Sequence, residues 1–348
     1  MTPGQRHKRR SGKGREAESP AQMPLAGWRE VALRVWSQSW DDNIGLVAAG
    51  VAFYGFLALV PLLGILVMVY GLVFNPATVV DHMRSLMRIL PPDVTLLIGQ
   101  LLMNSVKESA GAAGLGVLIA LGVALYAGGN GAGAIMTALN IAYEEKEKRS
   151  LLRFYLTAFA ITLVAVLIGL LALAAVAAIQ SLHGLVPLSS PLVTLGTAAG
   201  YLLLALAAAA IAASLYRFGP SREDARWEWI TPGSLFTAAV WLGLSAAFAF
   251  YVTRLTDYNA TYGSIAAIVM LLTWMYLSAY VFLFGAELNA ELEHQTARDT
   301  TTGKPEPLGE RGAWAADHVA GEEGDAAAEA GPSLAEAGPP KPTEEVKG

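Results

Sequence analysis

The sequence predicts an all-α fold: a polytopic membrane helix bundle with about six transmembrane helices and additional amphipathic helices at the interface. Apolar residues make up 54% of the 348 residues and charged residues only 15%, whereas a soluble domain carries about 25% charged residues. The charges gather near the two ends of the chain and in short clusters between long apolar runs. The chain contains no cysteine, which excludes disulfides, thiolate metal sites and cysteine nucleophiles.

Composition divides the chain into three parts. Residues 1–24 combine basic residues with glycine, serine and proline, and we expect a disordered basic arm. Residues 294–348 are rich in glycine, proline, alanine and glutamate without a sustained period, which predicts a disordered acidic tail. Between them, residues 25–293 form the predicted transmembrane domain, because each apolar run is long enough to cross a bilayer. The six spans are expected at about 44–74, 112–142, 156–179, 195–216, 233–252 and 263–285.

Two regions next to the spans are amphipathic. Trp28, Trp36 and Trp40 precede the first span at helical spacing, with basic residues on the other side, which is typical of a helix in the headgroup region. A helix packed into a small cytoplasmic cap is the alternative. Residues 75–111 predict two further amphipathic helices, divided by two prolines, at an interface or over the bundle. Pro61 lies in the middle of the first span and predicts a bend there.

Orientation follows from the loops. Lysine and arginine are abundant before the first span and in the loops after the second and fourth spans, whereas the loop 180–194 has neither. Cytoplasmic loops retain positive charge, so we expect both termini in the cytoplasm.

Amides and glycines inside the second span are the first candidates for function. Asn130 and Asn140 fall on similar faces of that helix, and buried amides need partners, so we expect both to face the bundle interior. They serve either as links between helices or as part of a site, with Tyr54, Tyr262 and Ser264 as possible partners. The glycine-rich run 128–133 predicts either very close helix packing or a helix break that lines a cavity.

Charged residues at the ends of spans are the second group. Glu287 and Glu291 share a face near the end of the sixth span, with Asn289 offset from them. Such a pair suits proton coupling or binding of a cationic group, although helix ends that re-enter water have the same composition. Arg217 closes the fourth span, where arginine anchors a helix at the interface or pairs with a lipid phosphate. Asp42, just before the first span, is expected to cap the helix start.

Catalytic and metal-binding patterns are missing from the sequence. The five histidines are scattered over different segments, without zinc-ligand spacing, and no phosphate-binding loop or nucleophile elbow is present. We therefore expect a protein that is not an enzyme, with no metal and no cofactor. No basic module for nucleic acid is visible, so the expected partners are membrane lipids, together with an envelope lipid or a small-molecule substrate. The oligomeric state is not predicted.

The chain resembles the YihY, or virulence factor BrkB, family of bacterial inner-membrane proteins. The resemblance covers about residues 35–293 and is most specific near the sixth span. It rests on the segments Ala48-Ala49-Gly50-Val51-Ala52-Phe53-Tyr54 with Pro61, Ala138-Leu139-Asn140-Ile141-Ala142-Tyr143, Leu215-Tyr216-Arg217, Pro220, Pro232-Gly233, Tyr262-Gly263-Ser264-Ile265-Ala266-Ala267, Trp274, and Gly285-Ala286-Glu287-Leu288-Asn289-Ala290-Glu291-Leu292.

The resemblance implies six spans and a multi-pass protein of the bacterial inner membrane. Members of the family were formerly labelled ribonuclease BN, an activity now attributed to an unrelated enzyme, and lipid handling in the envelope has been discussed for relatives. Our first hypothesis is therefore a transporter-like or lipid-handling protein. A structural or accessory membrane subunit is the alternative, and a membrane-associated ribonuclease that processes tRNA is the third.

Overall fold

The regular elements of the protein are helices. The computed structural model describes residues 13–73, 115–164, 167–168, 190–254 and 265–321, and in these ranges the one β feature is an isolated bridge between Ala225 and Thr301. The predicted all-α class is confirmed. The helices are η1 Pro20–Gln22, α2 Leu25–Asp41, α3 Ile44–Val73, α6 Leu115–Ala142, α8 Ser190–Phe218, α9 Trp227–Arg254, α11 Ile265–Gln295 and α12 Trp314–Asp317, together with an apolar helix Leu151–Val164.

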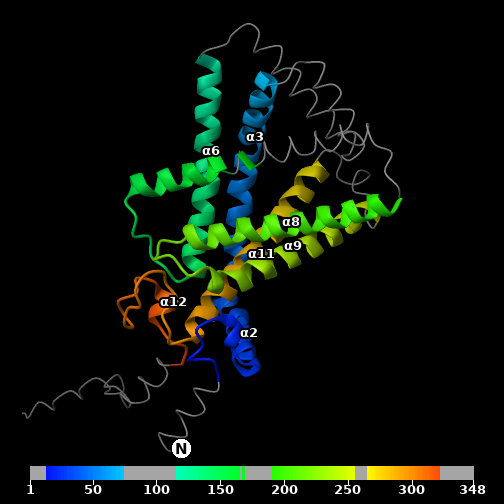
Figure 1. Ribbon diagram of the computed structural model, residues 1–348. Helices are drawn as coiled ribbons and strands as arrows, with labels where there is room; N and C mark the ends of the chain where they lie inside the picture. The colour runs from blue at the N-terminus through cyan, green and yellow to red at the C-terminus, as the bar shows by residue number, and fades with distance from the viewer. Residues whose placement is uncertain (1–12, 74–114, 165–166, 169–189, 255–264, 322–348) are drawn as a thin grey trace, which may run out of the picture.

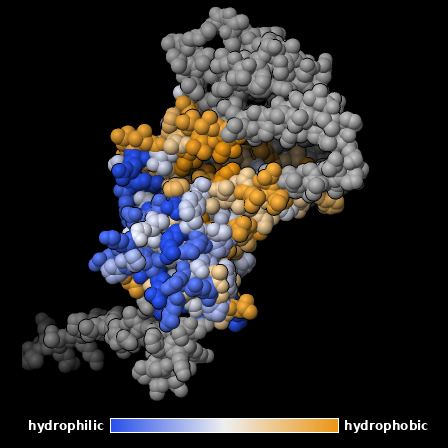
Figure 2. Space-filling view, in the orientation of Figure 1, coloured by the Kyte–Doolittle hydropathy of each residue, from blue (hydrophilic) through white to orange (hydrophobic). Residues whose placement is uncertain are grey.

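Helix α11 organises the fold, because it packs against both α3 and α9. Helices α3 and α6 lie side by side, as do α8 and α9, and the second pair crosses the first (Figure 1). Helix α2 covers one end of α11 and is bent by 65° from the first part of α3. Polar side chains gather at the end that holds α2 and α12, and apolar ones over the helices beyond it (Figure 2). This division matches a membrane domain with one polar end.

Two helical segments of the described chain, Trp227–Val252 and Ile268–Gln295, are long and apolar enough to cross a membrane, and the bent pair α2 and α3 gives a third if it counts as one span. The predicted spans 44–74, 112–142 and 195–216 coincide with α3, α6 and α8 as helices. Only the beginning of the predicted span 156–179 falls within the described residues. The described residues thus contain two or three helices that qualify as spans, whereas the sequence predicts six in the whole chain.

Small residues let the helices approach closely. Helix α6 is unbroken through residues 128–133, and a Cβ atom added to Gly131 would lie 3.3 Å from the Cβ of Ala58 on α3. The predicted helix break is therefore wrong, and close packing accounts for Gly131. A Cβ atom on Gly129 would meet no described atom within 4 Å, and Gly128 lines an apolar cavity. Helix α3 likewise continues through Pro61.

Three helices are longer than their predicted spans. Helix α8 runs from Ser190 to Phe218 instead of 195–216. Helix α9 begins at Trp227 instead of 233, because Trp229 and Ile230 are fully buried and hold the first turns in place despite Pro232. Helix α11 continues to Gln295 instead of re-entering water after 285. The acidic side chains of that extension are buried, so the expectation of a solvated helix end is wrong.

Parts of both predicted tails are ordered. The backbone N–H of Ala297 donates to the carbonyl of Arg15 at 2.8 Å, and Gln295 Nε2 donates to the carbonyl of Lys13 at 2.9 Å. The buried guanidinium of Arg311 donates to four backbone carbonyls, those of Ala297, Arg298, Glu306 and Ala316. Disorder was therefore the wrong prediction for residues 13–24 and 294–321, because composition does not register such long-range polar contacts.

Helix α2 combines features of both readings of its sequence. Its buried face, which includes Val31 and Val35, packs with Trp229 and Leu292, as in a cytoplasmic cap. Trp36 and Trp40 are 60% and 68% exposed, as in an interfacial helix. The predicted amphipathic region 75–111 lies outside the described residues.

Candidate functional site

The last three turns of α11, residues 285–295, carry a buried polar cluster, here called the α11 polar segment. Glu287 and Glu293 are 1% and 0% exposed, and Asn289 and Glu291 are also buried. Glu287 and Glu291, one turn apart, interact with Asp42 and Arg34 on the side of α2 and α3. Asn289 and Glu293 interact with Gly233 of α9 and Arg222 of the α8–α9 connection. The segment thus joins three parts of the fold.

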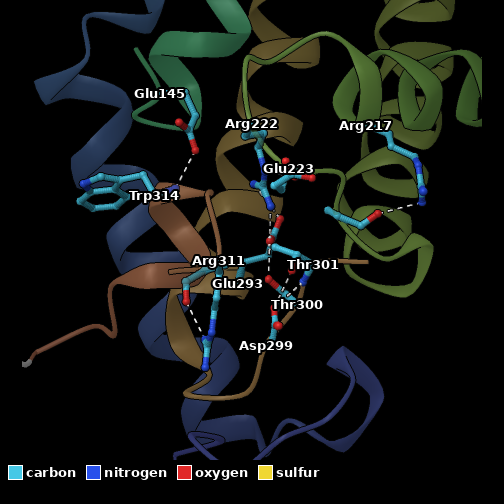
Figure 3. Close-up of polar contacts among 12 residues, drawn as sticks. Glu145, Arg217, Arg222, Glu223, Glu293, Asp299, Thr300, Thr301, Arg311 and Trp314 are labelled. Carbon is cyan, nitrogen blue, oxygen red and sulfur yellow. Dashed lines mark hydrogen bonds and ion pairs between the residues drawn. The ribbon is translucent and has the colours of Figure 1, made fainter. Parts of the chain in front are cut away.

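Arg222 and Glu293 form a buried ion pair. Two hydrogen bonds join the guanidinium to the carboxylate, from Nη2 at 2.6 Å and Nη1 at 3.1 Å, and Thr300 Oγ1 donates to the same carboxylate at 2.7 Å (Figure 3). The guanidinium also lies 5.1 Å from the ring centroid of Tyr143. Burial disfavours the charged guanidinium, but the neighbouring carboxylate outweighs burial and raises the pKa of Arg222.

Glu291 has its own cation. Arg34 Nε of α2 donates to Glu291 Oε2 at 2.5 Å, and Arg34 Nη2 donates to the Glu291 backbone carbonyl at 3.2 Å. His294 Nδ1 lies 3.7 Å from the same carboxylate. This pair fixes α2 against α11, so the role of Glu291 is the attachment of a helix.

Glu287 is different, because the charged group that acts on it most strongly is another carboxyl group, that of Asp42. Asp42, between α2 and α3, lies within hydrogen-bonding reach of Glu287. Glu287 Oε1, the Tyr143 hydroxyl and Asn289 Nδ2 are buried and have no hydrogen-bond partner among the described residues. Buried polar atoms without partners are rare in folded proteins, so this group stands out from the ion pairs around it.

Asn289 depends on two glycines for its position. The N–H of Gly233 on α9 donates to Asn289 Oδ1 at 2.7 Å. A Cβ atom on Gly233 would overlap the carbonyl of Gly285, and one on Gly285 would overlap the Thr237 hydroxyl. Helices α9 and α11 can approach this closely only because both positions lack a side chain.

Asn140 acts as a link between loops. The N–H of Ser221 donates to Asn140 Oδ1 at 2.7 Å, and Asn140 Nδ2 donates to Glu147 Oε2 at 2.9 Å. Arg149 donates to Glu147 Oε1 at 2.7 Å and to the carbonyl of Gly219 at 2.8 Å. The hydrogen bonds from Arg149, together with that from Asn140, lower the pKa of Glu147 to about 2. The end of α6 is thereby tied to the turn after α8.

Arg217 also works within the chain. Its guanidinium donates to the carbonyl of Ala225 at 2.8 Å, pairs with Asp224 at 3.6 Å and lies 4.6 Å from the ring centroid of Trp227. Arg217 therefore holds the turn between α8 and α9, and Figure 3 shows it away from the Arg222–Glu293 pair.

The remaining predicted residues lie elsewhere. Tyr54 is exposed on α3, Pro61 is half-buried within α3, and Asn130 is half-buried on α6. The structure therefore brings Glu287 and Asn289 together but does not add Tyr54 or Asn130 to them. The predicted Tyr262, Gly263 and Ser264 lie outside the described residues.

An apolar cavity of about 460 Å³ lies among α3, α6, α8, α9 and α11. Most of its wall is glycine, alanine and larger apolar side chains. Its hydroxyl groups have partners: Ser278 Oγ accepts from Trp241 Nε1 at 3.1 Å, Thr237 Oγ1 hydrogen-bonds to the Tyr216 hydroxyl at 2.7 Å, and Thr162 donates to the carbonyl of Ala158. The cavity therefore presents an almost wholly apolar interior.

Comparison with known proteins gives the family. The profile described as Virulence factor BrkB matches residues 35–308, well over half of the chain. The chain belongs to the virulence factor BrkB family. No solved structure matches it.

Relatives of this BrkB-family chain include proteins with different names. It is 28% identical over 251 residues to the ribonuclease-like protein YfkH of Bacillus subtilis, which covers 70% of this chain and 88% of that protein. It is 27% identical over 271 residues to a UPF0761 membrane protein of Delftia acidovorans, covering 76% and 62% respectively. A UPF0761 membrane protein of Rhodospirillum centenum is 26% identical over 277 residues, covering 77% and 59%. The chain thus spans about 60% of the two UPF0761 proteins.

The BrkB family match contains the whole α11 polar segment, and several residues that complete this segment were not predicted from the sequence. Arg34, Tyr143, Arg222 and Glu293 were not among the candidates predicted from the sequence, and Asp42 was predicted to cap the helix start. The available signal was the run of acidic and amide residues at every second position from Glu287 to Glu293. Such a run places polar groups on two opposite faces of a helix, which a single solvated face does not require. In the described chain, no group of three or more His, Cys, Asp or Glu residues is arranged to hold a metal ion.

Proposed function

We propose that this chain is a six-span protein of the bacterial inner membrane, with both termini in the cytoplasm, that binds and handles an envelope lipid. The observation that carries the proposal is the apolar cavity of about 460 Å³ among the long helices. A cavity of this size can hold a segment of an acyl chain, and each methylene buried in it contributes about 0.8 kcal/mol.

The chemistry of the wall supports an apolar occupant. Its hydroxyl groups already have partners within the chain, so a polar solute would find few groups to bind. Trp241, Trp274 and Phe282 supply aromatic surface on one side, and Gly131 and Ala132 leave room on the other. Ligand sites combine apolar walls with a few polar groups that set specificity, and here the apolar part dominates.

Lipid binding in the cavity is tested by filling the cavity with a larger side chain. Ala208 of α8 lines it, whereas Ala207, the preceding residue, is exposed on the same helix. Ala208→Phe and the matched control Ala207→Phe are purified in mild detergent with the wild type, and bound lipid per protein is measured by mass spectrometry. We expect the wild type and Ala207→Phe to retain lipid and Ala208→Phe to lose most of it. Equal retention by both variants, or no bound lipid in the wild type, contradicts the proposal.

A structural or accessory subunit is the second candidate, and Asn140 favours it. This buried amide, which could have belonged to a transport site, instead connects two loops. A wild-type protein without bound lipid would support this candidate. That the chain is not an enzyme stays a prediction. The name of the Bacillus subtilis relative makes metal-dependent RNA cleavage by the purified protein its direct test.

A further inference from the structure

We infer that Asp42 and Glu287 form a buried proton-binding site in which their two carboxyl groups share one proton. The inference concerns the ion bound at the end of α11 and does not depend on which molecule occupies the apolar cavity.

The first step is the contact between two carboxyl groups. Glu287 is 1% exposed, and the side chain of Asp42 lies within hydrogen-bonding reach of it. An ionised carboxylate can only accept hydrogen bonds, so two carboxyl groups can bond to each other only when one of them carries a proton. Two ionised carboxylates within hydrogen-bonding reach would repel each other strongly, because the site is shielded from water.

The second step is the charge balance around the pair. The other acidic groups that act on Glu287 are Glu291 and Glu144. Arg34, on α2, pairs with Glu291, and Arg222 pairs with Glu293. Gln38, also on α2, donates to Asp42 at 3.4 Å and to Glu144 at 3.1 Å but carries no charge. Among the described residues, therefore, no cation is committed to Asp42 or Glu287, and a proton is the charge that balances them.

Three buried polar atoms without hydrogen-bond partners in the described chain lie at or beside the Asp42–Glu287 pair. Tyr143, at the end of α6, is close enough to interact with both Asn289 and Glu287. The Tyr143 hydroxyl, Asn289 Nδ2 and Glu287 Oε1 are buried without a hydrogen-bond partner in the described ranges. Two of these atoms belong to donors and one is an acceptor, which suits proton exchange at Glu287 rather than a metal site. In agreement, burial raises the pKa of Asp42 above its usual value.

The hydrogen bond between Asp42 and Glu287 links two helices. Asp42 precedes α3, and Glu287 lies on α11, so the shared proton joins the start of one helix to the end of another. Loss of that proton places a second negative charge in the contact and weakens it. The site thus connects proton binding to the packing of α3 on α11.

The test is infrared spectroscopy of the full-length protein in detergent, which detects the C=O stretch of a protonated carboxyl group. We expect this absorption in the wild type at pH 7, and its loss in both Glu287→Gln and Asp42→Asn, each of which keeps the size of the side chain. The matched control Glu228→Gln removes an exposed carboxylate that pairs with Arg226 and should leave the absorption unchanged. Gel filtration establishes that each variant is folded, and the wild-type spectrum tests the proposal even if one variant is not.

Three results would overturn it. The first is that the C=O absorption is absent from the wild type at pH 7. The second is that it persists in both Glu287→Gln and Asp42→Asn, and the third is that sodium ions abolish it at constant pH. The last result would identify a cation as the occupant. None of these measurements depends on bound lipid, so failure here and failure of the proposed function are distinguishable.

Discussion

Removal of Arg222 should destabilise the folded protein more than removal of any exposed arginine. The Arg222 and Glu293 side chains are 2% and 0% exposed and share two hydrogen bonds. Arg222→Ala leaves the Glu293 carboxylate buried, with the Thr300 hydroxyl as its remaining hydrogen-bond donor among the described residues. Removal of one partner of a buried ion pair costs about 3–5 kcal/mol, and we expect a loss of that size in the free energy of unfolding.

Arg226→Ala is the matched control, because Arg226 lies in the same connection and pairs with Glu228 at 2.9 Å, with both side chains well exposed. An exposed pair contributes about 0–1 kcal/mol. Both variants are unfolded with denaturant in detergent micelles, and unfolding is followed by tryptophan fluorescence.

A double variant separates charge from packing. Arg222→Met with Glu293→Leu removes both charges, and apolar replacement of a buried ion pair is often neutral or stabilising. We expect the double variant to be more stable than Arg222→Ala. If Arg222→Ala lies within about 1 kcal/mol of the wild type, or matches Arg226→Ala, the claim that this pair is buried and coupled is refuted.

Two further predictions concern helix packing and pH. Gly285→Ala should reduce the yield of folded protein severely, because its Cβ would overlap the Thr237 hydroxyl and lie 2.7 Å from the Tyr216 hydroxyl; the yield is measured by gel filtration in detergent. Glu147 has a folded-state pKa of about 2, below its ordinary value of 4.5, so its contribution to stability is present above pH 4.5 and is lost as pH falls toward 2. Thermal unfolding of the wild type and Glu147→Gln across that range measures the contribution.

Each has a control. Gly243 on α9 has no described atom within 4 Å of an added Cβ, so Gly243→Ala should fold normally, and an equal loss in both variants would show that space is not the cause. For Glu147, Arg149→Gln removes the main source of the lowered pKa. It should therefore reduce the acid sensitivity as much as Glu147→Gln does; an unchanged pH profile in both would contradict the assignment.

Composition and length were sufficient for the fold class, because long uncharged runs have no place on a soluble surface. The positions of α3 and α6 follow closely from where those runs begin and end. The bounds of α9 and α11 do not, since a proline and a set of acidic residues normally mark the end of an apolar helix. In this fold Trp229 is buried against α2, and Glu293 pairs with Arg222. Both contacts join segments that lie far apart in the sequence.

The candidate site could be predicted only in part. Glu287 and Asn289 were identified from the sequence, and Glu291 was correctly placed one turn from Glu287. The partner of Glu287 was not identified, because Asp42 is more than two hundred residues away and reads as a helix cap. Asn130 and Asn140 show the opposite limit: similar helical phase does not guarantee equal burial, since Asn140 is buried and Asn130 is only half-buried.

The hydrogen bonds that join Lys13 and Arg15 to Gln295 and Ala297, at the end of α11, constrain the topology of the whole chain. Two segments joined by direct hydrogen bonds must lie on one side of the bilayer. The proposed topology of six spans meets this requirement, because an even number of crossings returns the chain to the side from which it started. A topology of five or seven spans would place the two segments on opposite sides of the bilayer and would be incompatible with these hydrogen bonds.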